Sequence, residues 1–244
     1  MITKADIQLV RSLADKRARE ERGLFVAEGS KIVDELAASS FTLHRIFTSA
    51  EKGYLYPAAE VVTAKELERM SSLKSPADVI AVVGIPQYEL PEKTGAELTL
   101  ALDDVQDPGN VGTIIRIADW FGIRDILCSH ATADAFAPKV VQATMGAISR
   151  VRIHYCDLVQ VLSGVGAPIY GTFMSGTNIY GAPLSQNGVI IMGNEGKGIS
   201  KEVEELVTER IAIPSYPAGR TGGSESLNVA TATAIVCSEF RRRG

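Results

Sequence analysis

Several features that mark common protein classes are scarce in this chain of 244 residues. Its three cysteines, Cys128, Cys156 and Cys237, lie far apart and form no CxxC pair, so the sequence predicts neither a disulfide framework nor a metal site. Reduced cysteines favour a cytoplasmic location. No apolar run approaches the roughly 18 residues that a membrane-spanning helix needs. The polar start of the chain also lacks the apolar core of a signal peptide.

The chain has no excess of positive charge, because its formal net charge is −4. This balance argues against a protein that coats nucleic acid through its overall charge. Any RNA recognition must then use local basic patches, and the alternative for each patch is a solvated helix face or a frayed tail. The two patches are Arg11, Lys16, Arg17, Arg19 and Arg22 near the start, and Arg241, Arg242 and Arg243 at the end.

The common nucleotide-binding fingerprints are also missing. A glycine-rich loop at residues 193–200 follows an apolar strand, but Lys197 is followed by Gly198 where a P-loop needs Ser or Thr. No strand is followed by GxGxxG, so a dinucleotide-binding crossover is disfavoured. Glycines in such a loop can still let the backbone approach a ligand closely.

Residues 1–88 predict a small α/β domain. A charged helix is expected at 4–22, and Thr63 and Glu66 form a capping box that begins a further helix. Apolar periodicity predicts a second helix after Ser30, and strands at 24–26, 45–47, 61–62 and 79–83. The polar stretch 89–97 predicts a linker.

Residues 98–244 predict an α/β domain with a parallel sheet, because short apolar strands alternate with helices. The strands are expected at 98–102, 125–128, 169–173, 189–192 and 210–213. Ligands of such sheets bind in the loops that follow the carboxyl ends of the strands. Three of those loops carry unusual residues, at 103–112, 193–200 and 214–228.

The helix after the first loop has two different faces. Its apolar residues recur at helical spacing, whereas Thr113, Arg116 and Trp120 share the opposite face. Arg and Trp together are typical of functional interfaces, although a surface arginine beside a partly covered tryptophan gives the same pattern. Asn110 alone is equally typical of a helix N-cap. The final helix is apolar or small almost all round, which predicts burial against its own chain or a second subunit.

Together the three loops resemble the SpoU (TrmH) family of SPOUT RNA 2′-O-ribose methyltransferases. The first family motif is similar to residues 110–112 with Arg116, the second to 191–198 and the third to 226–229. The match covers essentially the whole chain, and its N-terminal segment around residues 25–29 resembles the substrate-binding domain of the ribosomal-RNA branch. Three ordered motifs are more specific than any one of them.

The resemblance implies a deep trefoil knot in the C-terminal domain, a homodimer, and S-adenosyl-L-methionine as the methyl donor. The positions that match the donor site are Thr172, Gly193, Ile213, Ser226 and Leu227. The substrate implied is RNA, most simply ribosomal RNA, with transfer RNA and a non-catalytic RNA-binding role as alternatives. The expected RNA-binding residues are Arg11, Lys16, Arg17 and Arg19. A small insertion at 218–223 departs from the family pattern.

The family's reaction mechanism gives the catalytic roles to Arg116, Asn110, Glu195, Ser226 and Asn228. It makes Arg116 the general base, but deprotonating an arginine at neutral pH costs roughly 8 kcal/mol. Two roles therefore stay open for Arg116: a base, or a fork that clamps an adjacent phosphate and positions the hydroxyl. The resemblance implies that Glu195 and Asn228 order the pocket and that Ser226 orients Arg116 or the nucleotide.

Overall fold

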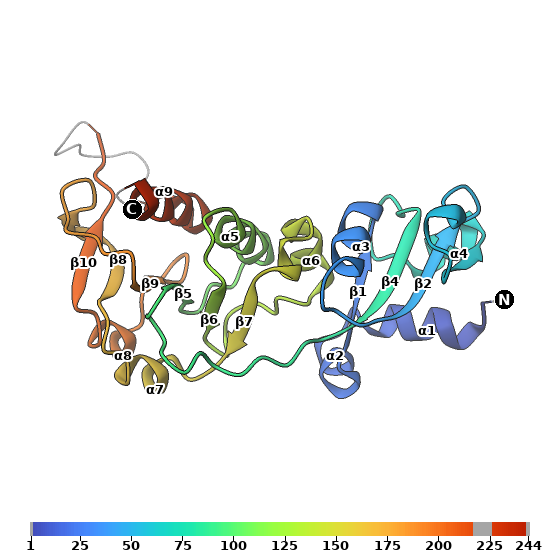
Figure 1. Cartoon of the computed structure of the whole chain (residues 1–244), viewed down its shortest axis with the longest axis horizontal. Helices are drawn as coiled ribbons and strands as arrows, with labels where there is room; N and C mark the ends of the chain where they lie inside the picture. Colours follow the sequence, from blue (N-terminus) through green and yellow to red (C-terminus); the bar gives the residue numbers. More distant parts are fainter. Residues whose placement is uncertain (1, 217–225, 243–244) are drawn as a thin grey trace. The chain divides into compact units, whose positions relative to one another are not determined.

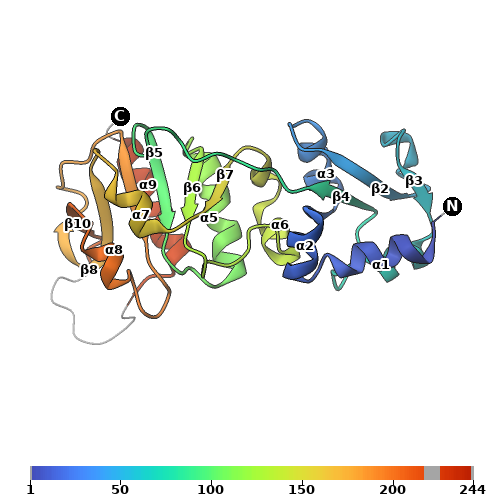
Figure 2. The same ribbon diagram turned by 90° about the horizontal axis from the view of Figure 1, so that it is seen from below.

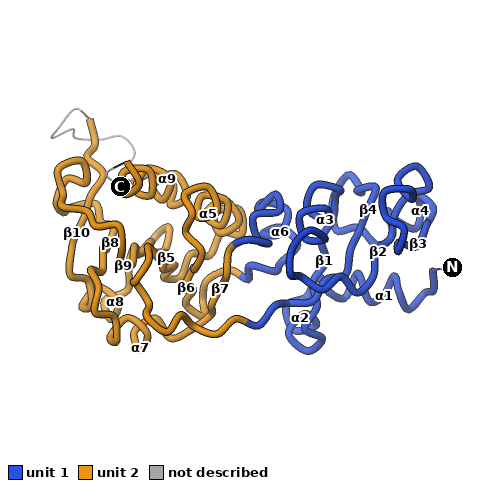
Figure 3. The backbone as a smooth tube through the Cα atoms, viewed as in Figure 1, with its two compact units in different colours: residues 1–87, 134–150 blue, residues 88–133, 151–244 orange. Residues whose placement is uncertain are grey.

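The computed structural model describes residues 2–216 and 226–242. The chain forms two compact units, drawn in different colours in Figure 3. Unit 1 comprises residues 1–87 together with 134–150, and unit 2 comprises 88–133 together with 151–244. Unit 1 is therefore built from two separate stretches of the sequence.

Unit 1 contains a four-stranded sheet in the order β1-β4-β2-β3. Its strands are β1 (Leu24–Glu28), β2 (Leu43–Ser49), β3 (Glu60–Val62) and β4 (Val79–Gly84). Its helices are α1 (Lys4–Ser12), α2 (Lys16–Arg22), α3 (Ser30–Ala37), α4 (Ala64–Met70) and α6 (Pro138–Thr144), with 3₁₀ turns η1 (Gly53–Leu55) and η2 (Ala147–Ser149). β4 pairs antiparallel with β1 and β2, whereas β2 and β3 are parallel.

The helix expected at 4–22 is two helices, which corrects the prediction. Asp15 has extended backbone and its side chain accepts a hydrogen bond from Ala18 N, so it caps a new helix. Leu13, which precedes this cap, is fully buried. The break therefore lets α1 place Leu13 in the core while α2 runs in a new direction.

The second stretch of unit 1, residues 134–150, packs on the first through a mixed contact. The rings of Phe25 and Phe136 lie 5.0 Å apart between centroids. Arg19 forms an ion pair of 2.5 Å with Asp134, and Arg150 pairs with Glu35. Sequence periodicity gave no sign of these contacts, because their partners lie more than a hundred residues apart along the chain.

Unit 2 contains a six-stranded sheet in the order β10-β8-β9-β5-β6-β7, and every neighbouring pair is parallel. The strands are β5 (Leu98–Leu102), β6 (Asp125–Cys128), β7 (Arg152–Tyr155), β8 (Ile169–Asn178), β9 (Gly188–Met192) and β10 (Glu209–Ala212). The helices are α5 (Pro108–Trp120), α7 (Leu158–Ser163), α8 (Lys201–Glu204) and α9 (Val229–Arg242). The predicted parallel sheet is confirmed, and β7 is a strand that the sequence analysis missed.

Helices cover both faces of this sheet, as Figures 1 and 2 show. α5 and α9 lie on one face, and α7 and α8 lie on the other. Val236, Cys237 and Phe240 of α9 are buried within their own chain, and the Phe240 ring packs edge-on against Tyr170. The sequence predicted that the final helix is buried against its own chain or against a second subunit. The structure shows that its own chain covers most of this helix.

Within the described ranges 2–216 and 226–242, no helix combines the length and apolar character needed to cross a bilayer. Cys128, Cys156 and Cys237 are free and buried. Burial raises the pKa of the Cys237 thiol to about 12 and that of Cys156 to about 11, so both are protonated at neutral pH.

Candidate active site

The candidate site lies at the carboxyl ends of β5 and β9, which are neighbours in the sheet. From β5 the chain first builds β6 and β7 on one side and then crosses to β8 on the other, so the strand order reverses here. Such a reversal leaves a crevice where ligands of parallel α/β sheets bind. The loops 103–107 and 193–200 follow these two strands directly.

Polar side chains tie these two loops together. A carboxylate oxygen of Asp103 accepts a hydrogen bond of 2.7 Å from Ser200 N. The side-chain amide of Asn194 donates to the carbonyl oxygen of Asp104, also at 2.7 Å. Hydrogen bonds between the two loops therefore fix the lining of the crevice.

The loop after β9 folds back on itself, and this fold requires a glycine at position 193. The sequence analysis did not find this requirement. Asn194 and Gly198 exchange two backbone hydrogen bonds of 2.9 Å each. A Cβ atom on Gly193 would lie 2.3 Å from the carbonyl carbon of Gly198, a separation that no side chain can tolerate. The glycine is required by the loop itself, and a role in donor binding stays a prediction.

Three of the predicted catalytic side chains form one hydrogen-bonded chain, which we call the amide chain: Glu195, Asn110 and Asn228. The amide nitrogen of Asn110 donates to Glu195 Oε1 at 3.0 Å, and its amide oxygen accepts from Asn228 Nδ2 at 2.8 Å. Asn228 Oδ1 in turn accepts from the backbone N–H groups of Ala230 and Thr231, so Asn228 caps α9. The amide chain thus joins the β9 loop to the starts of α5 and α9.

Glu195 is held as an ionised carboxylate. Partial burial acts to raise its pKa, but hydrogen bonds from the Asn110 amide and from the backbone N–H groups of Asp107 and Gln106 outweigh burial, so its pKa lies below the usual value. The backbone bonds measure 3.0 Å from Asp107 N and 3.2 Å from Gln106 N. A carboxylate with these donors is a weak base, so its geometry suits an anchor for Asn110.

Arg116 and Trp120 lie on the face of α5 that points away from the sheet. Arg116 and Thr113 are exposed, and 84% of the Trp120 surface is exposed. Val111, Ile114, Ile115 and Ala118 on the other face are buried, as the predicted helical pattern required. Among the residues described, none makes a hydrogen bond or ion pair with Arg116, so its guanidinium is free to meet an anion.

The positions expected to hold the methyl donor lie in or after neighbouring strands, or precede α9. Thr172 lies where β8 stops pairing with β9, and its hydroxyl donates to the carbonyl oxygen of Ile191 at 2.8 Å. Ile213 directly follows β10 and is half-buried. Ser226 and Leu227 are exposed just before α9, with 49% of the Leu227 surface exposed. Residues 218–223, the insertion noted in the sequence, lie outside the described residues.

The four expected RNA-binding residues fall into different environments. Arg11, Lys16 and Arg17 are exposed, but only 3% of Arg19 is exposed. Arg19 pairs with Asp134 and donates to the carbonyl oxygens of Leu13 and Ala14 at the end of α1. Arg19 is therefore unavailable to a phosphate, which corrects its predicted role.

Two functional features escaped the sequence analysis. The Asp107 side chain accepts a hydrogen bond of 2.9 Å from Asn110 N and is the N-cap of α5, so Asn110 is not. The pair Asp107-Pro108 carries this signal, because Asp is favoured at the cap and Pro at the first helical position. Arg69 on α4 joins Arg11 in a hollow of unit 1, and no local pattern points to that juxtaposition.

Known proteins match both parts of the chain. The SpoU rRNA methylase family matches residues 97–238, and the MRM3-like substrate binding domain matches residues 4–81. A 23S rRNA (guanosine(2553)-2′-O)-methyltransferase of Bacillus subtilis is 30% identical over 95% of this chain and 94% of its own length.

Solved structures match along the full length. A TrmH-family RNA methyltransferase structure from Porphyromonas gingivalis has a TM-score of 0.90 and 40% identity and covers 100% of both chains. An S-adenosylmethionine-bound rRNA methyltransferase from Sinorhizobium meliloti has a TM-score of 0.85 and 28% identity and covers 100% of this chain and 96% of its own.

The parallel sheet and the polar crevice at its strand reversal define a ligand-binding α/β protein, and the matches to known proteins make it a methyltransferase. The chain belongs to the SpoU rRNA methylase family. This confirms the family that the three sequence motifs predicted.

Proposed function

We propose that the protein transfers a methyl group from S-adenosyl-L-methionine to a ribose 2′-hydroxyl in ribosomal RNA. The observation that carries the proposal is the amide chain, which brings all three family motifs to one crevice at the start of α5, the helix that also carries the exposed Arg116. Relatives named as 23S rRNA 2′-O-methyltransferases, and an rRNA methyltransferase solved with S-adenosylmethionine, support the substrate and the donor.

The residues present suit the proposed donor. Thr172, Gly193 and Ile213 belong to three strands or loops that are neighbours in the sheet, and their backbone groups could bind an adenosine moiety. Ile213 and Leu227 provide apolar surface that adenine would cover. Bound S-adenosyl-L-methionine supplies a methyl group on a sulfonium centre, which a ribose oxygen can displace in line.

For Arg116 we favour the phosphate clamp over the general base. Deprotonating a free arginine at neutral pH costs roughly 8 kcal/mol. A guanidinium can bind a phosphate through two parallel hydrogen bonds and so position the neighbouring ribose hydroxyl. The proton of that hydroxyl then passes to solvent or to the substrate's own phosphate.

Glu195 and Asn228 act in this proposal as positioning residues. The oxygens of Glu195 accept hydrogen bonds from Asn110 and from the loop backbone, and Asn228 fixes the other end of the Asn110 amide. Asn110 is then held in one orientation at the start of α5, close along the chain to Arg116. Ser226 is exposed, so its role in orienting the nucleotide stays a prediction.

We also propose a homodimer that packs against Trp120 on the outward face of α5 and leaves the Arg116 guanidinium open to the RNA. Trp120 is exposed over 84% of its surface, and Trp and Arg are enriched at the centres of protein interfaces. An interface of roughly 1,600 Å² or more is expected. The trefoil knot, the functional boundaries at 1–88, 89–97 and 98–244, and the cytoplasmic location stay predictions.

Calorimetry and methyl mapping test the proposal. S-adenosyl-L-methionine should bind without added metal in the micromolar range, about −8 kcal/mol. The protein should then transfer labelled methyl to protein-free 23S rRNA, and mapping should place it on a ribose 2′-oxygen. If only transfer RNA is methylated, the proposed substrate is wrong and transfer RNA replaces ribosomal RNA. RNA binding without donor binding would favour the non-catalytic alternative.

A further inference from the structure

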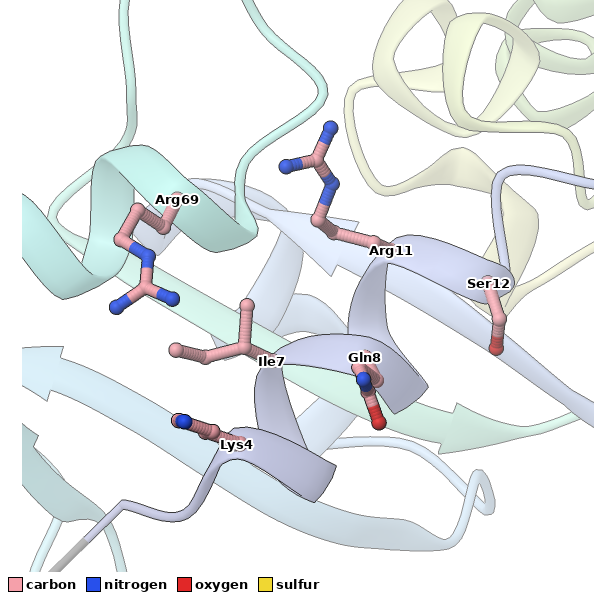
Figure 4. Close-up of a pocket in the computed structure, with 6 residues that line it drawn as sticks. All are labelled: Lys4, Ile7, Gln8, Arg11, Ser12 and Arg69. Atoms are coloured by element: carbon pink, nitrogen blue, oxygen red, sulfur yellow. The ribbon is translucent and has the colours of Figure 1, made fainter.

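A hollow of about 540 Å³ lies between α1 and α4 in unit 1, and Figure 4 shows the residues around it. We call it the α1–α4 groove. It is open to solvent, and its lining residues are Lys4, Ile7, Gln8, Arg11, Ser12 and Arg69. In Figure 4, Ile7 lies between Arg69 on α4 and the polar side chains of α1.

Helical spacing brings the α1 residues of the groove to one face. Lys4, Gln8 and Arg11 recur at intervals of three and four, so their side chains stack along the same side of the helix. Ile7 is nearly buried and packs into the core below, which gives the groove an apolar floor. Arg69, in the last turn of α4, completes the opposite wall.

The groove is cationic although the chain as a whole is acidic. Its three cations are Lys4, Arg11 and Arg69, and no carboxylate lines it. The nearby acids have hydrogen-bond partners outside the groove: Asp6 bonds to Thr3 and Arg45, and Glu66 caps α4 through Thr63 while it also attracts Arg69 electrostatically. Within residues 2–216 and 226–242, no ion pair involves a groove cation.

Basic residues of α2, in contrast, form ion pairs with neighbouring carboxylates. Lys16 lies 3.7 Å from Glu20, and Arg17 lies 2.7 Å from Glu21. A phosphate that approached either cation would meet the neighbouring carboxylate. The unpaired cations of the groove therefore offer a stronger site for a polyanion than the basic run that stands out in the sequence.

We propose that the α1–α4 groove binds the phosphate backbone of RNA, with Lys4, Arg11 and Arg69 contacting phosphates. This inference rests on the proposed function and names the surface of unit 1 that holds the substrate. The match of residues 4–81 to a substrate-binding domain spans both walls of the groove. An open, cationic trough suits a chain that passes through it.

The test compares two triple variants of the full-length protein. The groove variant is Lys4→Gln/Arg11→Gln/Arg69→Gln. The control variant is Lys31→Gln/Lys74→Gln/Lys139→Gln, which removes the same charge from exposed, unpaired positions of unit 1. Binding of a labelled RNA hairpin is measured over a range of salt concentrations, because contacts to phosphates weaken as salt rises. Any hairpin serves, since such contacts do not depend on the RNA sequence.

The groove variant should bind the hairpin at least tenfold more weakly than the control. Its slope of log K against log salt should be smaller by about 2 to 3, since each lost phosphate contact removes about 0.7–0.9. Calorimetry with S-adenosyl-L-methionine should give the same affinity in both variants. Equal RNA affinities and slopes in the two variants would overturn the proposal.

A second variant guards against a folding defect. Gln8→Glu adds one carboxylate to the groove and removes no cation, and Gln87→Glu makes the same change at an exposed position outside it. Only Gln8→Glu should weaken RNA binding. Polyglutamate that bound the wild type as tightly as RNA, and lost affinity in the groove variant, would assign the groove to an acidic protein and overturn the proposal.

Wild-type behaviour separates this inference from the proposed function. A wild type that methylates 23S rRNA while the groove variant equals its control contradicts only the groove. A wild type that neither binds nor methylates RNA contradicts the proposed function, and the groove proposal with it.

Discussion

The polar residues of the two units are arranged in opposite ways. In unit 2 the side chains of the crevice are tied to one another, because Asn110 bonds both Glu195 and Asn228. In unit 1 no carboxylate lines the α1–α4 groove, and none of its cations forms an ion pair within the described residues. Chemistry needs groups fixed in one geometry, whereas affinity for a polyanion needs charges that are still free to pair.

The largest expected effect comes from replacing Arg19. This replacement tests whether the buried Arg19 stabilises unit 1 and, unlike the groove cations, does not bind RNA. Arg19→Met should destabilise unit 1 by about 3–5 kcal/mol, because it leaves Asp134 without its buried partner. Thermal unfolding measures this loss. Below the unfolding temperature, the slope of log K for RNA against log salt should match that of the wild type. A smaller slope would show that Arg19 contacts RNA.

Removing the guanidinium of Arg116 is the next largest change. Arg116→Ala should lower the methylation rate a hundredfold or more, on the order of 3 kcal/mol. Donor affinity should stay nearly constant, since Arg116 is exposed and outside the expected donor positions. A near-normal rate would remove Arg116 from the mechanism.

Breaking the amide chain should have a smaller effect. Asn110→Ala removes both of its side-chain bonds and should lower the rate ten- to a hundredfold, about 1.4–2.7 kcal/mol. Asn228→Ala should add little to a protein that already carries Asn110→Ala, because linked residues are not additive. Additive losses in this double-mutant cycle would mean that the two amides act independently. Gln160→Ala, an exposed amide on α7, is the control.

A pH profile decides between the two roles of Arg116. Arg116→Lys keeps the charge, so a phosphate clamp should retain substantial activity that varies little between pH 7 and 9. If Arg116 were the base, the lysine variant should be slow and should become faster as its amine deprotonates at higher pH. Rates of Arg116→Lys and of the exposed control Arg124→Lys over this range give the answer.

Local patterns predicted the elements of unit 2 well. Strand bounds at 98–102 and 125–128 agree with β5 and β6, and the two faces of α5 followed from helical spacing. The residues of the crevice came from the family motifs, because Asn110 and Asn228 lie 118 positions apart and no periodicity links them.

Local patterns failed where distant residues meet. The pair Arg19 and Asp134 spans 115 positions, so Arg19 looked like one more cation on a charged helix. Residues 134–150 also belong to unit 1, although they lie far along the chain from the rest of it. Deleting residues 1–88 would therefore uncover Phe136 and leave Asp134 unpaired, and point variants test RNA binding more cleanly than that deletion.

The kinetic constants of two variants test the central comparison most directly. With 23S rRNA as substrate, Asn110→Ala should lower kcat and leave KM for RNA nearly unchanged, because it disturbs only the tied crevice. The groove variant Lys4→Gln/Arg11→Gln/Arg69→Gln should raise KM for RNA about tenfold and leave kcat at saturating RNA nearly unchanged. A fall in kcat alone for the groove variant, or a rise in KM alone for Asn110→Ala, would contradict this division between the two units.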